Sequence, residues 1–304
     1  MGCMLEVHNL TKTYRGQTAV NNLCFSVPDG QVTGFLGPNG AGKSTTMRMV
    51  VGLERPTGGS ATFDGMPFRS LKNPGRVVGT LLDATWFHPG RTAYSHLAIQ
   101  ATLMGLPANR IDECLEAVGL AGVAGKRVGG FSLGMKQRLG VACALLGNPK
   151  HVLLDEPVNG LDPEGVHWMR ERIRSLADDG CAVLISSHLL SEMELMADRL
   201  VVVGKGTLIA EGTVADFVGG SASVLLEVMP VDSDRARLLL AEKGLDVTDG
   251  DRAGQLVVGG ATPQDVGRLA FEHRLLVIGL KARTLSLEDA FLSTTANSVV
   301  YKAS

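Results

Sequence analysis

The chain has 304 residues, of which 45% are apolar and 20% charged, so it is too long for one average domain and too apolar to be intrinsically disordered. Its 29 basic and 31 acidic side chains give a net charge of −2, which offers no general electrostatic support for binding nucleic acid. We expect a folded protein with one large and one small domain, or with two equal domains.

The five cysteines, Cys3, Cys24, Cys114, Cys143 and Cys181, are scattered singly and odd in number. This argues against a disulfide framework and against a structural zinc site. The first ten residues lack the basic and apolar regions of a signal peptide, and no apolar stretch reaches the ~18 residues of a membrane span. We expect a soluble chain with buried, reduced cysteines, and any membrane role would depend on a partner.

Taken in chain order, the alternating residues near the N-terminus predict antiparallel strands, and the segment after them predicts a glycine-rich loop and a helix. The strands are expected at 4–7, 17–25 and 31–36, the loop at 37–42 and the helix at 43–52. Short strands are expected again over 60–82, and mostly helix over 92–147.

From residue 151 onward, strands and helices alternate. The strands at 151–154, 182–186 and 200–203 are almost entirely apolar, and helices at 164–178 and 189–197 separate them. Buried apolar strands joined by helices are typical of a parallel sheet in an α/β core.

The composition changes near residues 218–221, and a different pattern follows. Strands are predicted at 224–229, 245–248, 255–258 and 276–280, with helices at 232–242 and 263–272. The order βαββαβ is that of ferredoxin-like domains. We therefore predict a first domain of residues 1–217 and a small α+β domain of residues 221–304, which also holds a last helix at 286–294.

The glycine-rich loop matches the phosphate-binding pattern GxxxxGK[ST] in full. Its residues are Gly37, Pro38, Asn39, Gly40, Ala41, Gly42, Lys43, Ser44 and Thr45. Because it joins a buried strand to a helix start, its backbone N–H groups can surround a phosphate. Lys43 would reach the β- and γ-phosphates, and the Ser44 hydroxyl could ligate Mg²⁺. The alternative is a glycine turn with an incidental lysine, and the flanking elements favour a nucleotide site.

A second apolar strand ends in Asp155 and Glu156, which places two carboxylates at the carboxyl edge of the sheet. Asp155 would hold Mg²⁺, usually through water, and Glu156 would act on the attacking water as general base. Two solvated acids at a strand end are the alternative. Together with the phosphate loop, the pair predicts hydrolysis of a nucleoside triphosphate.

Between these motifs lies Phe131-Ser132-Leu133-Gly134-Met135, which precedes a helix predicted at 136–146. Ser132 is the natural N-cap of that helix. The segment also resembles the Leu-Ser-Gly-Gly-Gln signature of ABC transporter ATP-binding subunits, and the resemblance covers about residues 4–217. It implies a P-loop ABC ATPase core with a mixed sheet and a helical subdomain at about 84–147. It also implies that Ser132 and Gly134 contact the γ-phosphate of ATP held by the opposite subunit.

Other roles follow from the same resemblance. Tyr14 matches the aromatic residue that stacks on adenine, and Asp162, in Asn-Gly-Leu-Asp, matches the residue that couples the two sites of a dimer. His188 matches the switch histidine at the γ-phosphate. Asp83 stands where the family has a glutamine, and its acid could still face Mg²⁺. The signature itself departs from the family at Leu133 and Met135.

Asp83 and the altered signature together resemble the antibiotic and lantibiotic exporter branch. The resemblance implies a homodimer around two ATP and Mg²⁺, which drives a separate ABC-2 type membrane subunit. The chain would then lie on the cytoplasmic face of the cell membrane, held there by that subunit. It would export an antibiotic, peptide or other amphipathic compound and so give drug resistance. Trp86 and Phe87 would either enter a groove of the membrane partner or pack under the helices.

Three alternatives stay open. A soluble ABC-type ATPase acting on a macromolecular complex usually has two cassettes or long coiled coils, and this chain has one cassette and no sustained heptads. A phosphoryl-transfer kinase would leave residues 132–138 and His188 without a role. A third possibility is an ATPase that binds ATP but turns over slowly because of Asp83, Leu133 and Met135.

Overall fold

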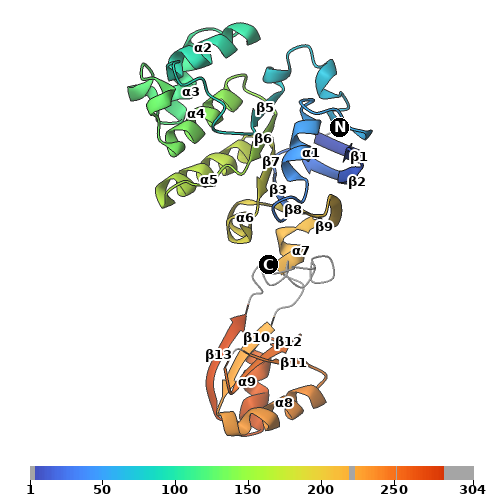
Figure 1. The fold of residues 1–304 in the computed structure, drawn as a ribbon. Helices are drawn as coiled ribbons and strands as arrows, with labels where there is room; N and C mark the ends of the chain where they lie inside the picture. The colour runs from blue at the N-terminus through green and yellow to red at the C-terminus, as the bar shows by residue number, and fades with distance from the viewer. Residues whose placement is uncertain (1–3, 219–222, 251, 284–304) are drawn as a thin grey trace. The chain divides into compact units, whose positions relative to one another are not determined.

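The computed structural model describes residues 4–218, 223–250 and 252–283, and the chain divides into two compact units after Gly212 (Figure 1). Each unit has its own cluster of buried apolar side chains. None of the helices within these residues is long and apolar enough to cross a membrane. The domain boundaries predicted from the sequence stay predictions, and the helix expected at 286–294 lies outside the described residues.

A six-stranded sheet in the order β5-β6-β7-β3-β8-β9 forms the centre of the first unit. The strands are β3 (Val32–Leu36), β5 (Val78–Leu81), β6 (His151–Asp155), β7 (Ala182–Ser187), β8 (Arg199–Gly204) and β9 (Thr207–Thr213). The four pairings from β5 to β8 are parallel. Strands β3 and β7 are buried along their whole length, as expected for a sheet covered on both faces. The predicted parallel α/β core is therefore confirmed.

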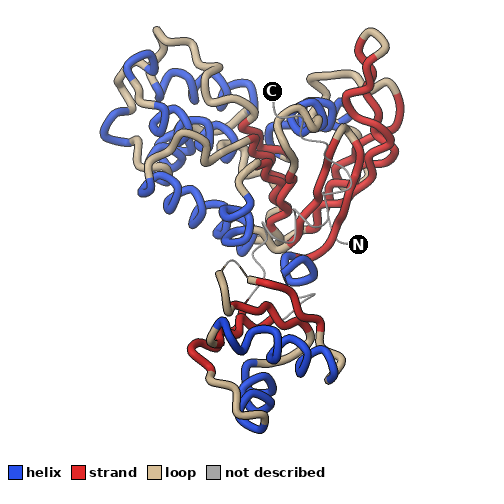
Figure 2. Tube along the Cα trace, turned by 60° about the horizontal axis from the view of Figure 1, so that its bottom comes forward, coloured by secondary structure: helices blue, strands red, loops and turns tan. Residues whose placement is uncertain are grey.

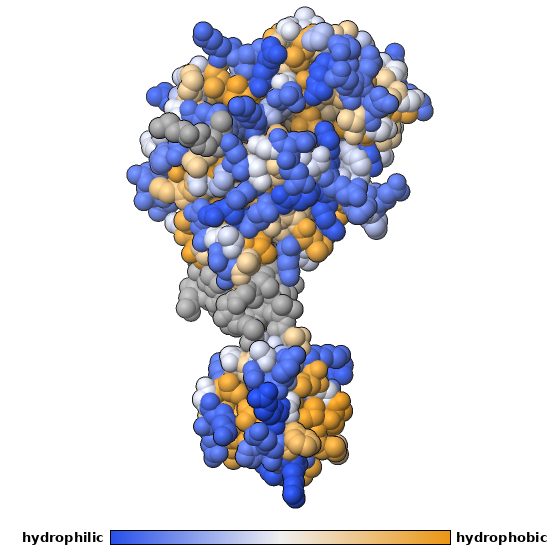
Figure 3. Space-filling model, turned by 180° about the vertical axis from the view of Figure 1, so that it is seen from behind, coloured by the Kyte–Doolittle hydropathy of each residue, from blue (hydrophilic) through white to orange (hydrophobic). Residues whose placement is uncertain are grey.

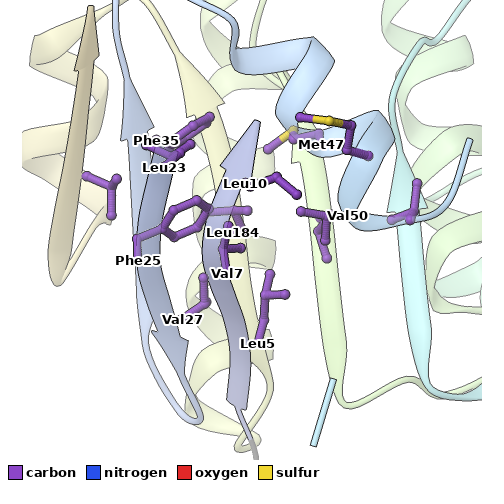
Figure 4. Packing of buried hydrophobic residues seen from close by; sticks show 14 of the residues in the cluster. Leu5, Val7, Leu10, Leu23, Phe25, Val27, Phe35, Met47, Val50 and Leu184 are labelled. Carbon is purple, nitrogen blue, oxygen red and sulfur yellow. The ribbon is translucent and has the colours of Figure 1, made fainter. Parts of the chain in front are cut away.

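A second, antiparallel sheet in the order β2-β1-β4 packs against the first. Its strands are β1 (Met4–Tyr14), β2 (Gln17–Pro28) and β4 (Gly58–Phe63). Figure 4 shows Phe25 of β2, Phe35 of β3 and Met47 of helix α1 (Lys43–Val50) in one apolar cluster, and the rings of Phe25 and Phe35 stack with centroids 5.2 Å apart. The sequence analysis placed β3 with the antiparallel strands, and this was wrong. Because β3 is buried along its whole length, it belongs between β7 and β8 in the covered sheet.

Helices α2 (Ala93–Met104), α3 (Asn109–Ala117) and α4 (Leu133–Leu145) connect β5 to β6 and gather beside these strands in Figures 1 and 2. The predicted helical stretch is thus three helices with short 3₁₀ turns at Ala121–Val123 and Val128–Gly130. Helix α4 lies so close to β5 that a Cβ added to Gly79 would come within 2.1 Å of the Ala144 carbonyl oxygen. The strands expected over 60–82 are only partly correct, because 3₁₀ turns at Phe68–Ser70 and Pro74–Arg76 separate β4 from β5.

Helices α5 (Pro163–Asp178) and α6 (Leu190–Met196) make the two crossovers that follow, and α7 (Val214–Val218) ends the first described stretch. The four cysteines among the described residues are free. Only Cys114 is fully buried, whereas the other three are half-buried, so the expected burial is wrong for them. Burial of its thiol nevertheless raises the pKa of Cys143 to about 12.

The second unit is a four-stranded antiparallel sheet in the order β11-β12-β10-β13 with two helices. Its elements are β10 (Ser223–Val228), a 3₁₀ turn (Pro230–Asp232), α8 (Ser233–Glu242), β11 (Asp246–Asp249), β12 (Gln255–Gly259), α9 (Pro263–Glu272) and β13 (Val277–Arg283). This βαββαβ order confirms the ferredoxin-like prediction. Its surface also carries apolar residues, including Leu238 and Phe271, and Figure 3 shows apolar patches on it.

Candidate functional site

The phosphate loop borders a cavity of about 290 Å³ at the carboxyl end of β3. The lining residues are Ala19, Pro38, Asn39, Gly40, Gly42, Lys43, Ser44, Thr45 and Glu156. Gly40 and Gly42 have φ of +82° and +99°, a left-handed conformation that glycine adopts readily. No side chain caps α1 at Gly42, so the N–H groups of its first turn face the loop. The local structure therefore has the shape that a bound phosphate needs.

Lys43 is buried beneath this loop. Its ammonium group donates a hydrogen bond to the Gly37 carbonyl oxygen at 2.6 Å and lies 3.4 Å from the Pro38 carbonyl oxygen. It also lies 3.6 Å from Glu156 Oε1. The cationic group is thus held by the loop itself in the wall of the cavity.

The carboxyl ends of β6 and β7 bring the other predicted catalytic residues to the same place. Glu156 Oε2 lies 2.8 Å from His188 Nδ1, and Glu156 Oε1 pairs with Lys43. Lys43, Glu156 and His188 therefore form one connected cluster around a single carboxylate. Asp155, beside Glu156, accepts a hydrogen bond from Ser186 Oγ. The sequence analysis did not include Ser186, because only the pairing of β6 with β7 shows that it is near.

A separate cavity of about 180 Å³ lies at the start of α4 and α5. It is lined by Ser132, Gly134, Met135, Arg138, Leu161, Asp162, Glu164, Gly165 and Trp168. Ser132 Oγ accepts from the Met135 N–H at 3.2 Å, and Asp162 Oδ1 accepts from the Gly165 N–H at 2.9 Å, so both residues are helix N-caps. The structure thus brings together Ser132, Gly134 and Asp162. No residue lines both this cavity and the phosphate cavity.

Two predicted residues have other neighbours. The Asp83 carboxylate accepts hydrogen bonds from the Thr85 N–H at 2.7 Å and the Thr85 hydroxyl at 2.6 Å, which closes a turn after β5. Tyr14 is 43% exposed, and the ammonium group of Lys12 lies 4.7 Å from the centre of its ring. Neither residue lines the phosphate cavity. Their predicted roles at Mg²⁺ and adenine stay predictions.

The two aromatic residues after Asp83 differ in environment. Phe87 is half-buried and packs edge-on against His96 of α2, with ring centroids 5.0 Å apart. Trp86 is 61% exposed, and the Arg48 guanidinium lies 5.7 Å from the centre of its ring. The packing alternative therefore holds for Phe87, whereas Trp86 is exposed, and its entry into a groove of a membrane partner stays a prediction.

The oxygen donors at the phosphate cavity fit a Mg²⁺ ion that is shared with a nucleotide. Ser44 lines the cavity and is exposed there, whereas Asp155 does not line it but directly precedes the lining residue Glu156 and has one carboxylate oxygen bonded to Ser186 Oγ. The described residues contain no group of three His, Cys, Asp or Glu side chains able to hold a metal. Mg²⁺ is commonly bound by one or two protein oxygens together with phosphate oxygens.

Comparison with known proteins agrees with this geometry. Residues 20–159 match the ABC transporter family model, and residues 227–288 match a model for a domain of unknown function. The chain is 38% identical to the bacitracin transport ATP-binding protein BcrA of Bacillus licheniformis, over 99% of this chain and 100% of the relative. It is 40% identical to the lantibiotic transport ATP-binding protein SrtF of Streptococcus pyogenes, over 68% of this chain and 90% of that one. The chain belongs to the family of ABC transporter ATP-binding proteins.

A solved structure described as the ATP-binding subunit of an ABC transporter has a TM-score of 0.64 and 30% sequence identity, and covers 70% of this chain and 91% of that one. The predicted P-loop ABC ATPase core is confirmed. The protein is thus an ATP-binding subunit of an ABC transporter that binds and hydrolyses ATP. This finding excludes the kinase hypothesis and favours the transporter over a soluble ATPase acting on a macromolecular complex.

Proposed function

We propose that two copies of this subunit enclose two ATP molecules and two Mg²⁺ ions, and that closing and reopening of the pair drives a separate membrane subunit of the ABC-2 type. The observation that supports this most strongly is that the phosphate cavity and the signature cavity share no residue. One chain holds two half-sites on different elements. A second copy, turned to place Ser132 and Gly134 against the phosphate loop of the first, would complete both sites.

Within each site, the roles follow from chemistry and position. Lys43 and the loop N–H groups neutralise the phosphates, and Tyr14 stacks on adenine. Ser44 and Asp155 would hold Mg²⁺, and Asp83 is proposed as a further acid that faces the ion. Glu156 accepts the proton of the attacking water, because its carboxylate lies in the cavity and contacts both Lys43 and His188.

The remaining proposed-site residues act on the nucleotide from the second copy. Ser132 and Gly134 direct the N-terminus of α4 at the γ-phosphate, where its dipole favours negative charge. Asp162, which caps α5, links this contact to the adjacent site.

The proposed substrate class rests on the names of two relatives, and the proposed membrane partner rests on the exposed apolar side chains of the helical subdomain. One relative is named for bacitracin transport and another for lantibiotic transport, so we propose export of an antibiotic, peptide or other amphipathic compound. The helical subdomain exposes Trp86 at 61% and Leu103 at 81%, which suits contact with an apolar partner. The subunit would then lie on the cytoplasmic face of the membrane through that partner, without nucleic acid.

The test uses Glu156→Gln, which keeps the shape of the side chain and removes its charge. Phosphate release with Mg²⁺ should fall about 100-fold or more, because general-base catalysis contributes about 10²–10⁴-fold. ATP binding should persist, so light scattering should show an ATP-dependent doubling of mass. Lys43→Ala is the control, and should show neither tight ATP binding nor the mass change. A Glu156→Gln protein that binds ATP but stays monomeric would contradict the sandwich.

A further inference from the structure

Ser186 lies beside Asp155 because of strand register. In the parallel pairing of β6 with β7, Asp155 is the direct partner of Ser186, although the two are 31 residues apart in sequence. Paired residues on neighbouring strands point to the same face of the sheet. The Ser186 side chain is fully buried, at 0% exposure. Its hydroxyl therefore lies at the level of the two carboxylates and is shielded from solvent.

The hydroxyl of Ser186 makes two hydrogen bonds of opposite sense. It donates its one proton to Asp155 Oδ1, and it accepts the backbone N–H of Glu156 at 2.9 Å. A serine hydroxyl has one donor and two acceptor positions, so donation to Asp155 leaves only acceptor positions for Glu156. One side chain thus fixes the rotamer of the first carboxylate and the backbone of the second.

Glu156 needs such a support. Its φ is +48°, in the left-handed region that is unfavourable for a residue other than glycine. Residues are held in this region when the surrounding structure over-determines them, and such positions cluster at functional sites. Here the backbone turn directs the Glu156 carboxylate to Lys43 and His188. The bond to Ser186 secures the N–H at the start of that turn.

We propose that Ser186 is a positioning residue for hydrolysis, which holds Asp155 toward Mg²⁺ and Glu156 toward the attacking water through a single hydroxyl. The proposal rests on the roles of Asp155 and Glu156 in the proposed function. Ser186 is fully buried and does not line the phosphate cavity, so its loss should leave the phosphate loop intact. What should change is the response to Mg²⁺ and the rate of the chemical step.

The experiment compares Ser186→Ala with the wild type in phosphate release over a titration of free Mg²⁺. We expect kcat to fall about tenfold and the Mg²⁺ concentration for half-maximal activity to rise about tenfold, since two half-buried polar groups, the Asp155 carboxylate and the Glu156 N–H, lose a partner. KM for ATP at saturating Mg²⁺ should stay within about twofold. Ser186→Cys, which keeps the volume with a weaker donor, should give an intermediate result, and it serves in place of Ser186→Ala if that variant does not fold.

Ser187→Ala is the matched control. Ser187 is the next residue of the same strand and equally buried, but its hydroxyl accepts the Leu189 N–H at 2.9 Å and has no contact with either carboxylate. It reports the general effect of removing a buried hydroxyl from β7. Its Mg²⁺ requirement should equal that of the wild type.

A second readout does not depend on turnover. In the Glu156→Gln background, Mg²⁺ should strengthen ATP binding, and adding Ser186→Ala should reduce that enhancement about tenfold by calorimetry. If the wild type released no phosphate, the proposed function would fail while this binding test of Ser186 would still stand. A folded Ser186→Ala protein with the Mg²⁺ requirement of the wild type, or a Ser187→Ala protein with the same shift, would overturn the proposal.

Discussion

Leu133 shows how a departure from the family signature is accommodated by its neighbours. It stands where the signature has a glycine, and its side chain lies over Gly160, so that a Cβ at Gly160 would be 2.5 Å from Leu133 Cδ2. Gly160 also has φ of +72°. The signature and the loop that carries Asp162 are therefore packed together through one leucine and one glycine.

We predict that Gly160→Ala slows ATP hydrolysis a few-fold, because the added methyl meets the end of the 42%-exposed Leu133 side chain, which must turn away between the cavity residues Ser132 and Gly134. Gly180→Ala is the matched control, since Gly180 has φ of +90° but nothing within 4 Å of an added Cβ. Both variants should lose about 1–2 kcal/mol of stability from the left-handed backbone. Only Gly160→Ala should lose activity in a phosphate-release assay.

The double variant Leu133→Ala with Gly160→Ala decides whether the contact is the cause. Removing the leucine makes room for the new methyl, so activity should rise above that of Gly160→Ala alone. Equal activity of the double variant and Gly160→Ala would contradict this explanation.

The site residues that stand in sequence motifs could be predicted from the sequence, whereas Ser186, which belongs to no motif, could not. Lys43, Glu156 and His188 were predicted, and the structure brings them together. Ser186 was missed because its significance depends on the register of two parallel strands, which no local pattern contains. Asp83 was assigned to Mg²⁺ from its place in the family alignment. In the structure its carboxylate accepts two hydrogen bonds from Thr85, and the sequence alone did not show this turn.

Among the elements, α2 is joined to the segment after β5 by a ring contact that is sensitive to protonation. Burial, and secondarily the charge of Arg91, lowers the pKa of His96, which packs against Phe87. A histidine whose pKa is lowered on folding favours the neutral form. Its contribution to stability is therefore present above the unfolded pKa of 6.5 and is lost as pH falls below it.

We predict that His96→Gln reduces the loss of stability on acidification. The free energy of unfolding would be measured by denaturant titration at pH 7.5 and about 5.5, followed by tryptophan fluorescence. The wild type should lose more stability between these values than the variant does, because only the wild type takes up a proton at this site. The prediction would be contradicted if the free energies of unfolding of the wild type and the variant differed by the same amount at both pH values.

The ends of helices could be predicted where a capping residue marks them in the sequence. Helix α9 begins and ends where predicted, with Thr262 and Asp265 forming a capping box at its start. Helix α4 begins three residues before its predicted start because Ser132 caps it directly. Strand pairing was harder to predict, because the five residues of β3 do not by themselves show which strands lie beside it.

Across the whole molecule, the two units have separate cores. Leu226 is fully buried in the second unit among side chains of β12 and the two helices. Both tryptophans, Trp86 and Trp168, belong to the first unit. Fluorescence therefore reports the first unit alone, whereas far-ultraviolet circular dichroism reports both.

We predict that Leu226→Ala destabilises the second unit by about 2–5 kcal/mol, as large-to-small changes in cores do. The circular dichroism transition should broaden or split, while the tryptophan transition and ATP affinity stay unchanged. Leu225→Ala, on the half-exposed side of the same strand, should have a much smaller effect. Equal shifts of both probes in Leu226→Ala would show instead that the units unfold together.

The register between β6 and β7 also limits how this protein can change over generations. Insertions near Gly180, in the turn between α5 and β7, leave both strands intact and can be tolerated. A deletion of one residue inside β7 would turn Ser186 to the opposite face and carry His188 with it, because side chains alternate along a strand. Insertions and deletions in proteins that evolve from this chain should therefore occur in turns such as the one at Gly180, before β7. The number of residues from Ala182 to His188 should stay constant.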